Sequence, residues 1–406
     1  MNKHIISDAK RCLQCNKPLC SAGCPIGTPI KEAIRLFLES KVYEAGEILF
    51  DNNPLSLICC FVCPQENQCE GHCVLAKKGA PVSISAIEQY ISDYYLNTYT
   101  PKPSMKNRGK VAIIGSGPAG ITIAILLARK DYDVTIFEGY DQIGGIMRYG
   151  IPEFRLPKSI LDRLTDKLIE YGVKIRPNVT IGINLEVDDL FRDDYRAVFI
   201  GTGTWRPSKL GIKGESLGHV NFAIDYLKSP DVYRLGKSLI IIGAGNVAMD
   251  VARTAFRHGC KDVQIFCISD ESSITARDYE VQYAKIDGTK FEMNKAAVEI
   301  VDGGVIFADT DNQARPIPNT EKLFPADSVI VAIGQGPRST IVSSTKGIDI
   351  NEKGLVAVNK SGHTSREGVF ASGDVVTGAK TVVEAVVASR RVADAIDMYI
   401  TDKYLN

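Results

Sequence analysis

Residues 111–138, VAIIGSGPAGITIAILLARKDYDVTIFE, combine an apolar strand, a glycine-rich turn, a helix and a second apolar strand. Gly115, Gly117 and Gly120 follow the first strand and open the helix. Their bare amides and the helix N-terminus can hold a pyrophosphate. Glu138 ends the second strand 18 residues after Gly120, where a carboxylate can accept hydrogen bonds from an adenosine ribose. The stretch therefore predicts a dinucleotide-binding unit in a doubly wound parallel sheet.

The same pattern recurs at 238–266, SLIIIGAGNVAMDVARTAFRHGCKDVQIF. Gly243 and Gly245 repeat the turn, and Ala248 stands in the third place, where only close packing of helix on strand is needed. Asn246 and Val247 complete the turn. The chain therefore contains a second dinucleotide-binding unit.

The end of the second unit differs from that of the first. Cys267 takes the place of Glu138, and no arginine follows it to meet a 2'-phosphate. Asp270 and Glu271 are the candidate ribose acceptors. We therefore expect NADH to be favoured slightly over NADPH, although Arg277, in the next loop, could reverse that preference.

A third fingerprint, GVFASGD, ends at Gly373 and Asp374 and precedes a helical stretch at 381–399. An aspartate at such a turn can bind the ribityl chain of a flavin. It can equally cap a helix, and this motif alone does not separate the two roles.

Cysteines are concentrated at the N-terminus, with nine of the eleven in the first 73 residues. Such clusters in a reducing cytosol favour iron–sulfur or zinc binding over disulfides. Two Cys-Pro pairs, and close triplets with a distant fourth cysteine, favour iron and sulfide over zinc. Zinc would need Cys60 and Cys63 as a second Cys-x2-Cys pair. The two motifs contain seven cysteines, one fewer than a pair of four-iron clusters requires, so Cys59, Cys60 or a downstream carboxylate is the eighth ligand.

Composition narrows the function classes further. The 406 residues are 45% hydrophobic, with 48 basic and 48 acidic side chains, as in a soluble globular protein. The balanced charge argues against nucleic-acid binding, and no apolar run is long enough to cross a membrane. The opening MNKHIISDAKRC lacks the pattern of a secretory signal, so we expect a cytoplasmic protein.

Several motifs together resemble the family of the glutamate synthase small subunit. The family includes the flavin half of dihydropyrimidine dehydrogenase and the NADPH-binding subunit of bifurcating transhydrogenase. The resemblance covers nearly the whole chain and rests on the N-terminal cysteine pattern, VCPQENQCEGHC (62–73), GSGPAG, IGGIMRYGIPEFRLPK (143–158), GAGNVAMD and GVFASGDVVTGAKTVVEAV (368–386).

The resemblance implies an α/β fold with two Rossmann-like domains, the second inserted in the first, after an α-helical ferredoxin-like cysteine domain. It implies a double [4Fe-4S] domain at 1–104, an FAD domain at 105–214 and 326–406, and an NAD(P)H domain at 215–325. One cluster would take Cys12, Cys15, Cys20 and Cys73, and the other Cys24, Cys63, Cys69 and Glu88.

The implied FAD contacts are Gly115, Gly117, Pro118, Ala119, Gly120, Glu138, Gly144, Gly145, Arg148, Arg155, Gly201, Thr202, Gly203, Gly373, Asp374, Thr381 and Val382. The implied NAD(P)H contacts are Gly243, Gly245, Asn246, Val247, Ala248, Asp270, Arg277 and Gly334. No acid–base catalyst is expected, because hydride transfer needs alignment of the two cofactors.

The implied function is that of an electron-input subunit. NAD(P)H would reduce FAD, and single electrons would pass through two clusters to a partner subunit, or run in reverse. Family members that use NADPH usually have arginines where Ile268 and Ser269 stand, and the stretch 294–325 is shorter here. The alternative is a non-enzymatic nucleotide sensor with a zinc-stapled N-terminus.

Overall fold

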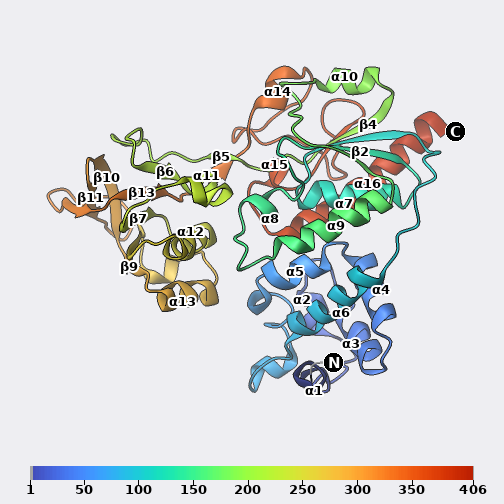
Figure 1. Ribbon diagram of the computed structural model, residues 1–406, viewed down its shortest axis with the longest axis horizontal. Helices are drawn as coiled ribbons and strands as arrows, with labels where there is room; N and C mark the ends of the chain where they lie inside the picture. The colour runs from blue at the N-terminus through green and yellow to red at the C-terminus, as the bar shows by residue number, and fades with distance from the viewer. Residues whose placement is uncertain (1–2, 406) are drawn as a thin grey trace. The chain divides into compact units, whose positions relative to one another are not determined.

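The computed structural model describes residues 3–405 (Figure 1). The described chain forms two compact units. The first contains 3–147, 153–204 and 337–405, and the second contains 148–152 and 205–336. The domain boundaries drawn from the sequence stay predictions.

The N-terminal part of the first unit is a helical domain (Figure 1). Its core contains Ala33, Phe37, Leu49, Ile87 and Ile91, all nearly inaccessible to solvent. Its elements are α1 (Lys3–Ala9), α2 (Leu19–Gly23), α3 (Ile30–Leu38), α4 (Val42–Asn52), α5 (Ser56–Val62), η1 (Gln65–Asn67), η2 (Val74–Lys77) and α6 (Ile84–Thr98).

The same unit contains a five-stranded sheet in the order β15-β4-β1-β2-β3, with every pairing parallel. The last strand in the chain, β15, thus lies beside β4. The residues of the second unit therefore stand in the sequence between two neighbouring strands of this sheet. The strands are β1 (Lys110–Ile114), β2 (Asp133–Phe137), β3 (Lys174–Arg176), β4 (Tyr195–Ile200) and β15 (Val369–Ala371).

Helix α7 is apolar on every side because it is buried on every side. It is packed between β1 and β2 of the sheet and α16, and nine of its eleven residues are buried. Pro118 stands at its first turn, where the missing amide costs nothing. The helices of this part are α7 (Pro118–Ala128), α8 (Ile146–Tyr149), α9 (Lys158–Glu170), α10 (Val187–Arg192), α14 (Thr340–Ser344), α15 (Asp374–Thr377) and α16 (Val382–Ile400).

The second unit has its own parallel sheet, in the order β6-β13-β7-β8-β9. Strand β13, which follows the predicted boundary at residue 326, pairs with β7 in this sheet. Its elements are β6 (Val220–Phe222), α11 (Ala223–Lys228), η3 (Pro230–Val232), β7 (Ser238–Ile242), α12 (Asn246–Arg257), β8 (Asp262–Phe266), η4 (Glu271–Ser273), α13 (Asp278–Asp287), β9 (Lys290–Glu292) and β13 (Ser328–Val331).

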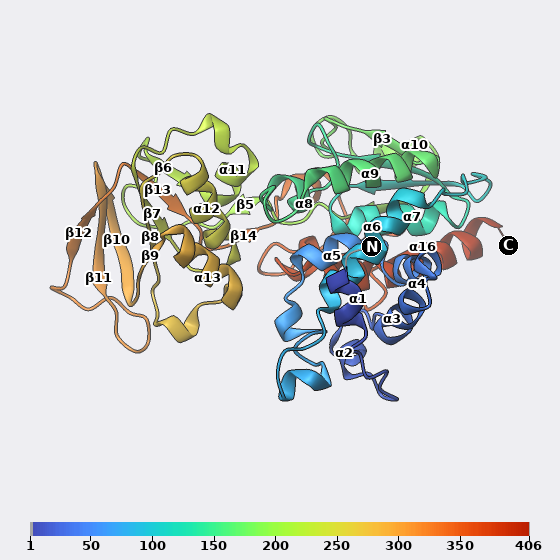
Figure 2. The same ribbon diagram turned by 60° about the horizontal axis from the view of Figure 1, so that its bottom comes forward.

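Residues 295–325, which the sequence marks as short, form an antiparallel sheet of β10 (Lys295–Val301), β11 (Gly304–Asp309) and β12 (Lys322–Pro325). It packs beside the parallel sheet, as Figure 2 shows, and Phe307 stacks on Phe266 with ring centroids 3.9 Å apart. A short pair, β5 (Arg206–Pro207) and β14 (Gln335–Gly336), joins the two chain segments at which the unit starts and ends. The predicted fold class is confirmed: two parallel dinucleotide-binding sheets follow a helical domain.

Candidate functional site

The first glycine turn runs from β1 into α7. The Gly115 amide donates to the Phe137 carbonyl over 2.8 Å, and Gly115 has a φ of +92°, which favours glycine. A Cβ on Gly120 would lie 2.0 Å from the Gly115 carbonyl oxygen, so only glycine lets α7 approach β1 this closely. A Cβ on Gly117 would meet no heavy atom within 4 Å, which leaves the backbone open to a phosphate.

Glu138 lies beside this turn and is 6% exposed. Its carboxylate accepts hydrogen bonds from the Ser116 amide (3.0 Å), the Ser116 hydroxyl and the Tyr140 amide (2.9 Å). The sequence reading missed Ser116, which ties the carboxylate to the glycine turn. Each carboxylate oxygen has two lone pairs, so acceptor capacity for a ribose remains.

Other predicted flavin contacts gather around the same turn. The Gly144 amide donates to the Ser116 carbonyl over 3.0 Å, and a Cβ on Gly145 would lie 2.7 Å from the Cα of Gly117. A Cβ on Gly115 would lie 2.7 Å from the carbonyl oxygen of Gly201. Thr202 and Gly203 follow Gly201, Pro118 and Ala119 open α7, and Arg155 is partly buried after α8. Arg148 belongs to the second compact unit.

Gly373 and Asp374 lie at the start of α15, with Gly373 against the first turn of α7. Asp374 accepts from the Lys380 amide over 3.2 Å, and burial raises its pKa to about 6. Thr381 caps α16 and forms a capping box with Glu384, and Val382 is the first residue of that helix. Asp374 thus binds loop backbone as the capping alternative requires, and it also lines a cavity of about 210 Å³.

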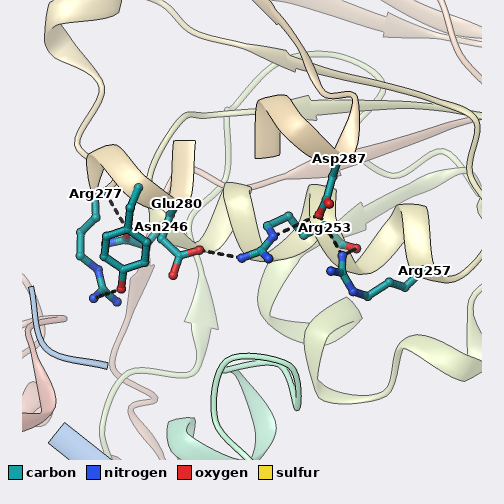
Figure 3. Close-up of polar contacts among 7 residues, drawn as sticks. Asn246, Arg253, Arg257, Arg277, Glu280 and Asp287 are labelled. Carbon is teal, nitrogen blue, oxygen red and sulfur yellow. Dashed lines mark hydrogen bonds and ion pairs between the residues drawn. The ribbon is translucent and has the colours of Figure 1, made fainter. Parts of the chain in front are cut away.

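The second glycine turn runs from β7 into α12. The Gly243 amide donates to the Phe266 carbonyl over 2.9 Å, which matches the bond at Gly115. Asn246, at the start of α12, accepts through Oδ1 from the Arg277 backbone amide over 3.0 Å (Figure 3). Val247 and the buried Ala248 follow on the helix, and Gly334 accepts from the Ser208 amide over 3.0 Å.

Arg277 is 9% exposed, and its guanidinium donates to the Tyr279 hydroxyl over 2.5 Å. Because its backbone amide bonds Asn246, Arg277 lies at the glycine turn, where the pyrophosphate binds. A 2'-phosphate is recognised at the end of the second strand, so this position does not favour NADPH.

An ion-pair network joins α12 to α13 (Figure 3). Arg253 contacts Glu280 over 3.0 Å and Asp287 over 3.1 Å, and Asp287 also contacts Arg257 over 3.0 Å. Glu280 is 1% exposed. The sequence reading missed this network. It fixes the start of α13, and with it Arg277, against the glycine turn.

The end of β8 is where a ribose acceptor is expected. Cys267 is buried there, and its amide donates to the Glu292 carbonyl over 2.9 Å. Asp270 is exposed, and its Oδ1 accepts the hydroxyls of Ser272 (2.6 Å) and Ser273 (2.9 Å). These bonds lower the pKa of Asp270, which keeps it ionised. The backbone amides of Ser272 and Ser273 also bond this carboxylate and help to lower its pKa.

Two lysines near this strand end are paired with acids. Lys295 contacts Asp309, and Lys285 contacts Glu271 over 2.6 Å.

In the helical domain, Cys12, Cys15, Cys20 and Cys73 line one cavity of about 30 Å³, among apolar side chains. Burial and the charges of Cys73 and Cys12 raise the pKa of Cys20. The structure therefore brings together the four residues expected to hold one cluster.

The second set meets around Glu88 of α6. Burial and the negative charge of Glu70 raise the pKa of Glu88 to about 8. Burial, the charge of Glu88 and the charge of Cys24 raise the pKa of Cys69. A hydrogen bond with Cys59, burial and the charge of Glu88 raise the pKa of Cys63.

Cys59 and Cys60 lie beside the second set on α5. The Cys60 thiol donates to the Ser56 carbonyl over 3.1 Å, and Asn53 donates to the Cys59 sulfur over 3.2 Å. Both thiols therefore have protein partners, but so do the expected ligands Cys12, Cys24 and Cys63, and the choice of Glu88 as the eighth ligand stays a prediction.

Within residues 3–405, no three histidine, cysteine or carboxylate side chains are drawn together around a point that a single metal ion would occupy. Four thiolates around a cavity suit a cluster better, because the cluster itself fills the space between its ligands. In the part of the chain that the structure describes, no helix is long and apolar enough to span a membrane.

The fold and these turns define a two-domain dinucleotide-dependent oxidoreductase with a cysteine-rich N-terminal domain. Residues 109–391 match the pyridine nucleotide-disulphide oxidoreductase family, and residues 1–100 match the 4Fe-4S domain II of dihydropyrimidine dehydrogenase. The chain belongs to this oxidoreductase family, so the predicted resemblance is confirmed.

Named relatives sharpen the placement. The chain is 34% identical to the glutamate synthase [NADPH] small chain of Halomonas elongata, over 97% of this chain and 90% of that protein. It is 33% identical to the NAD-dependent dihydropyrimidine dehydrogenase subunit PreT of Salmonella typhimurium, over 98% and 94% of the two chains. The T. acidophilum thioredoxin reductase structure shares the fold, with a TM-score of 0.58 and 24% identity over 72% of this chain and 97% of that one.

Proposed function

We propose that the chain oxidises NADH and passes the electrons through FAD and two [4Fe-4S] clusters to a partner subunit. FAD, when bound, accepts a hydride and releases its two electrons one at a time. The chain's own residues bind and align the reactants, and no side chain is needed as an acid or base.

One observation carries this proposal. Pro25, the neighbour of Cys24, lines the same cavity as Gly373 and Asp374, the third flavin fingerprint. Helix α5, which ends just before Cys63, packs against α16 of the flavin domain. These contacts support a position of the second cysteine set next to the flavin site.

Contacts between the helical domain and the flavin domain support a fixed path. Arg390 donates to the Asn52 carbonyl over 2.7 Å, and Arg163 contacts Asp93 over 2.8 Å. Tyr99, at the end of α6, contacts Tyr171. These contacts fix the helical domain against the flavin domain. The distance from each cysteine set to the flavin turn is then constant, as efficient electron transfer requires.

The preference for NADH is supported by the end of β8. Asp270 offers a carboxylate oxygen to a ribose hydroxyl, and it would repel a 2'-phosphate. Lys295 and Lys285 are each held by an acid there. The relatives' printed names include both cofactors, NADPH for the glutamate synthase chain and NAD for PreT.

The partner and the compartment are further parts of the proposal. The relatives are named as small chains and subunits, which supports a second subunit that accepts or donates electrons. No disulfide links the cysteines within residues 3–405, which supports a reducing cytoplasm.

The variant Cys20→Ser tests the division of labour. We expect NADH to bleach the flavin at the parent rate while electron delivery to an artificial acceptor at the clusters falls at least 100-fold. Cys260→Ser, a buried cysteine of the nucleotide domain, is the matched control and should retain both steps. Loss of flavin bleaching in Cys20→Ser would contradict the proposal.

The alternative function, a zinc-stapled sensor, makes an opposite prediction for composition. Anaerobically purified protein should contain about eight iron and eight acid-labile sulfide per chain if two four-iron clusters are bound. Zinc without sulfide would favour the sensor.

A further inference from the structure

The cavity of the first cysteine set is surrounded by exposed apolar side chains. Leu13 is 63% exposed, Leu19 44% and Val74 37%, and all three line that cavity together with the four cysteines. We call these three residues the apolar rim. The apolar side chains of α3 and α6 are, in contrast, mostly buried in the domain core.

Lysines surround the apolar rim. Lys17 lies between Cys15 and Leu19 in the sequence, Lys77 ends the short helix that Val74 begins, and Lys78 follows it. Lys31 lines the cavity itself. Within residues 3–405, none of these four lysines makes an ion pair or a side-chain hydrogen bond.

Acidic side chains near the rim are already occupied. Asp8 is bound by Arg11 and by the Ser83 amide, and Glu70 accepts from the amide and hydroxyl of Ser85. Glu32 pairs with Arg35 over 2.5 Å. The four lysines therefore have no acidic partner within residues 3–405 and are available to pair with a docked protein.

An apolar centre inside a charged border is the usual anatomy of a protein interface. The apolar rim excludes water from the contact, and the lysines attract and orient a partner of opposite charge. The cysteine cavity lies among these side chains, so a partner docked here would lie next to the four cysteines.

We propose that this face, the apolar rim with Lys17, Lys31, Lys77 and Lys78, docks an electron-carrier protein that presents acidic side chains around its own redox centre. The inference rests on the proposed function. With a cluster held by the four cysteines, one electron would pass between that cluster and the carrier's redox centre, one being oxidised as the other is reduced, and no bond, proton or further reactant would take part.

The test uses the holoenzyme and two carriers of opposite charge. A reduced plant-type [2Fe-2S] ferredoxin, which is acidic, is mixed with the holoenzyme, and its oxidation is followed by stopped flow. Horse-heart cytochrome c, which is basic, is offered as an oxidised acceptor to holoenzyme reduced with NADH. Both reactions are measured at low and at high salt.

The test variant is Lys17→Glu/Lys77→Glu/Lys78→Glu. The matched control is Lys346→Glu/Lys353→Glu/Lys360→Glu, which changes the charge equally at exposed lysines of the flavin domain. Bleaching of the flavin by NADH serves as the folding control and should be unchanged in both variants.

We expect the test variant to lower the second-order rate with ferredoxin about tenfold or more at low salt and to raise the rate with cytochrome c. High salt should remove most of both differences. The control variant should stay within about twofold of the parent.

Equal effects of the two variants, or no effect of either, would overturn the docking face. So would an absence of electron exchange between the parent holoenzyme and ferredoxin while NADH still bleaches the flavin, and the proposed function would then stand. Failure of NADH to bleach the flavin would instead count against the proposed function.

Discussion

The turn at Gly115 and the turn at Gly243 share one backbone design and differ at the end of the following strand. In the first, Glu138 is buried and bound by the Ser116 and Tyr140 amides. In the second, Cys267 is buried, and the candidate acid is the exposed Asp270, which is bound by the hydroxyls of Ser272 and Ser273. We infer that the same phosphate-binding turn can serve a resident cofactor or an exchanging substrate. A buried carboxylate bound by backbone amides suits the first role, and an exposed carboxylate suits the second.

The helices after the two turns differ in the same sense. Helix α7 is apolar and enclosed by the sheet and α16, so it is part of a closed core. Helix α12 is fixed to α13 through Arg253 and Glu280, and this pair positions the loop that carries Arg277. We attribute the difference to what each unit binds: FAD stays, whereas the nicotinamide cofactor must enter and leave.

The largest effect is expected from exchanging the third residue of the two turns. In Gly120→Ala, the new Cβ would lie 2.0 Å from the Gly115 carbonyl oxygen, so α7 must move. We expect a loss of about 3 kcal/mol or more in stability, and protein purified without FAD. The reverse change, Ala248→Gly, should cost only about 1 kcal/mol. Thermal unfolding and the flavin-to-protein ratio measure both, and full FAD content in Gly120→Ala would contradict the packing argument.

The second-largest effect on stability is expected from the ion-pair network between α12 and α13. Glu280→Gln removes the charge that faces Arg253 in a buried pair, and we expect a loss of about 2–3 kcal/mol in the stability of the second unit. The exposed pair of Glu271 and Lys285 gives the control: Glu271→Gln should cost less than about 1 kcal/mol. Urea unfolding compares the two, and equal effects would show that burial of the pair is irrelevant.

Asp374 predicts a dependence on pH. Burial raises its pKa from 3.8 to about 6, so the folded, flavin-free protein binds more protons than the unfolded chain in this range. The free energy of unfolding therefore falls as pH rises from about 4 to about 6. The free energy of unfolding of flavin-free Asp374→Asn should be about 1–2 kcal/mol higher than that of the flavin-free parent at pH 7.5. The two values should be equal near pH 4. The same difference at both values in thermal unfolding would refute this origin.

The smallest effect is expected at Asp270. In Asp270→Asn, the ribose loses a charged acceptor and a 2'-phosphate loses a repelling charge. We expect kcat/KM for NADH to fall about tenfold, or about 1.4 kcal/mol, while that for NADPH holds or rises. Asp302→Asn, at an exposed acid in the turn between β10 and β11 of the same unit, provides the control variant in steady-state kinetics. An equal fall with both nucleotides would show that Asp270 does not read the ribose.

Much of the fold could be predicted because its signals are local. Strand, glycine turn and helix are adjacent in sequence, and the helix expected at 381–399 forms as Val382–Ile400. Long-range contacts could not be predicted. Glu138 and Ser116 are 22 residues apart, and Arg253 and Glu280 are 27 apart, and no periodicity links them.

The cysteine ligands could be predicted only in part. Spacing alone showed that seven cysteines need an eighth ligand, but it left Cys59, Cys60 and a carboxylate open. Only the folded helices bring Glu88 beside Cys69 and give Cys60 a backbone partner at Ser56. The grouping of Cys73 with Cys12, Cys15 and Cys20 likewise depends on the tertiary fold.

The most direct test of the account is an anaerobic titration of the holoenzyme with NADH and, separately, with NADPH. We expect NADH to bleach the flavin rapidly, cluster reduction to follow, and NADPH to act more slowly. Bleaching by NADPH alone would contradict the reading of the β8 end. No bleaching by either nucleotide, with FAD bound, would contradict the central claim that this chain admits electrons from a nicotinamide cofactor.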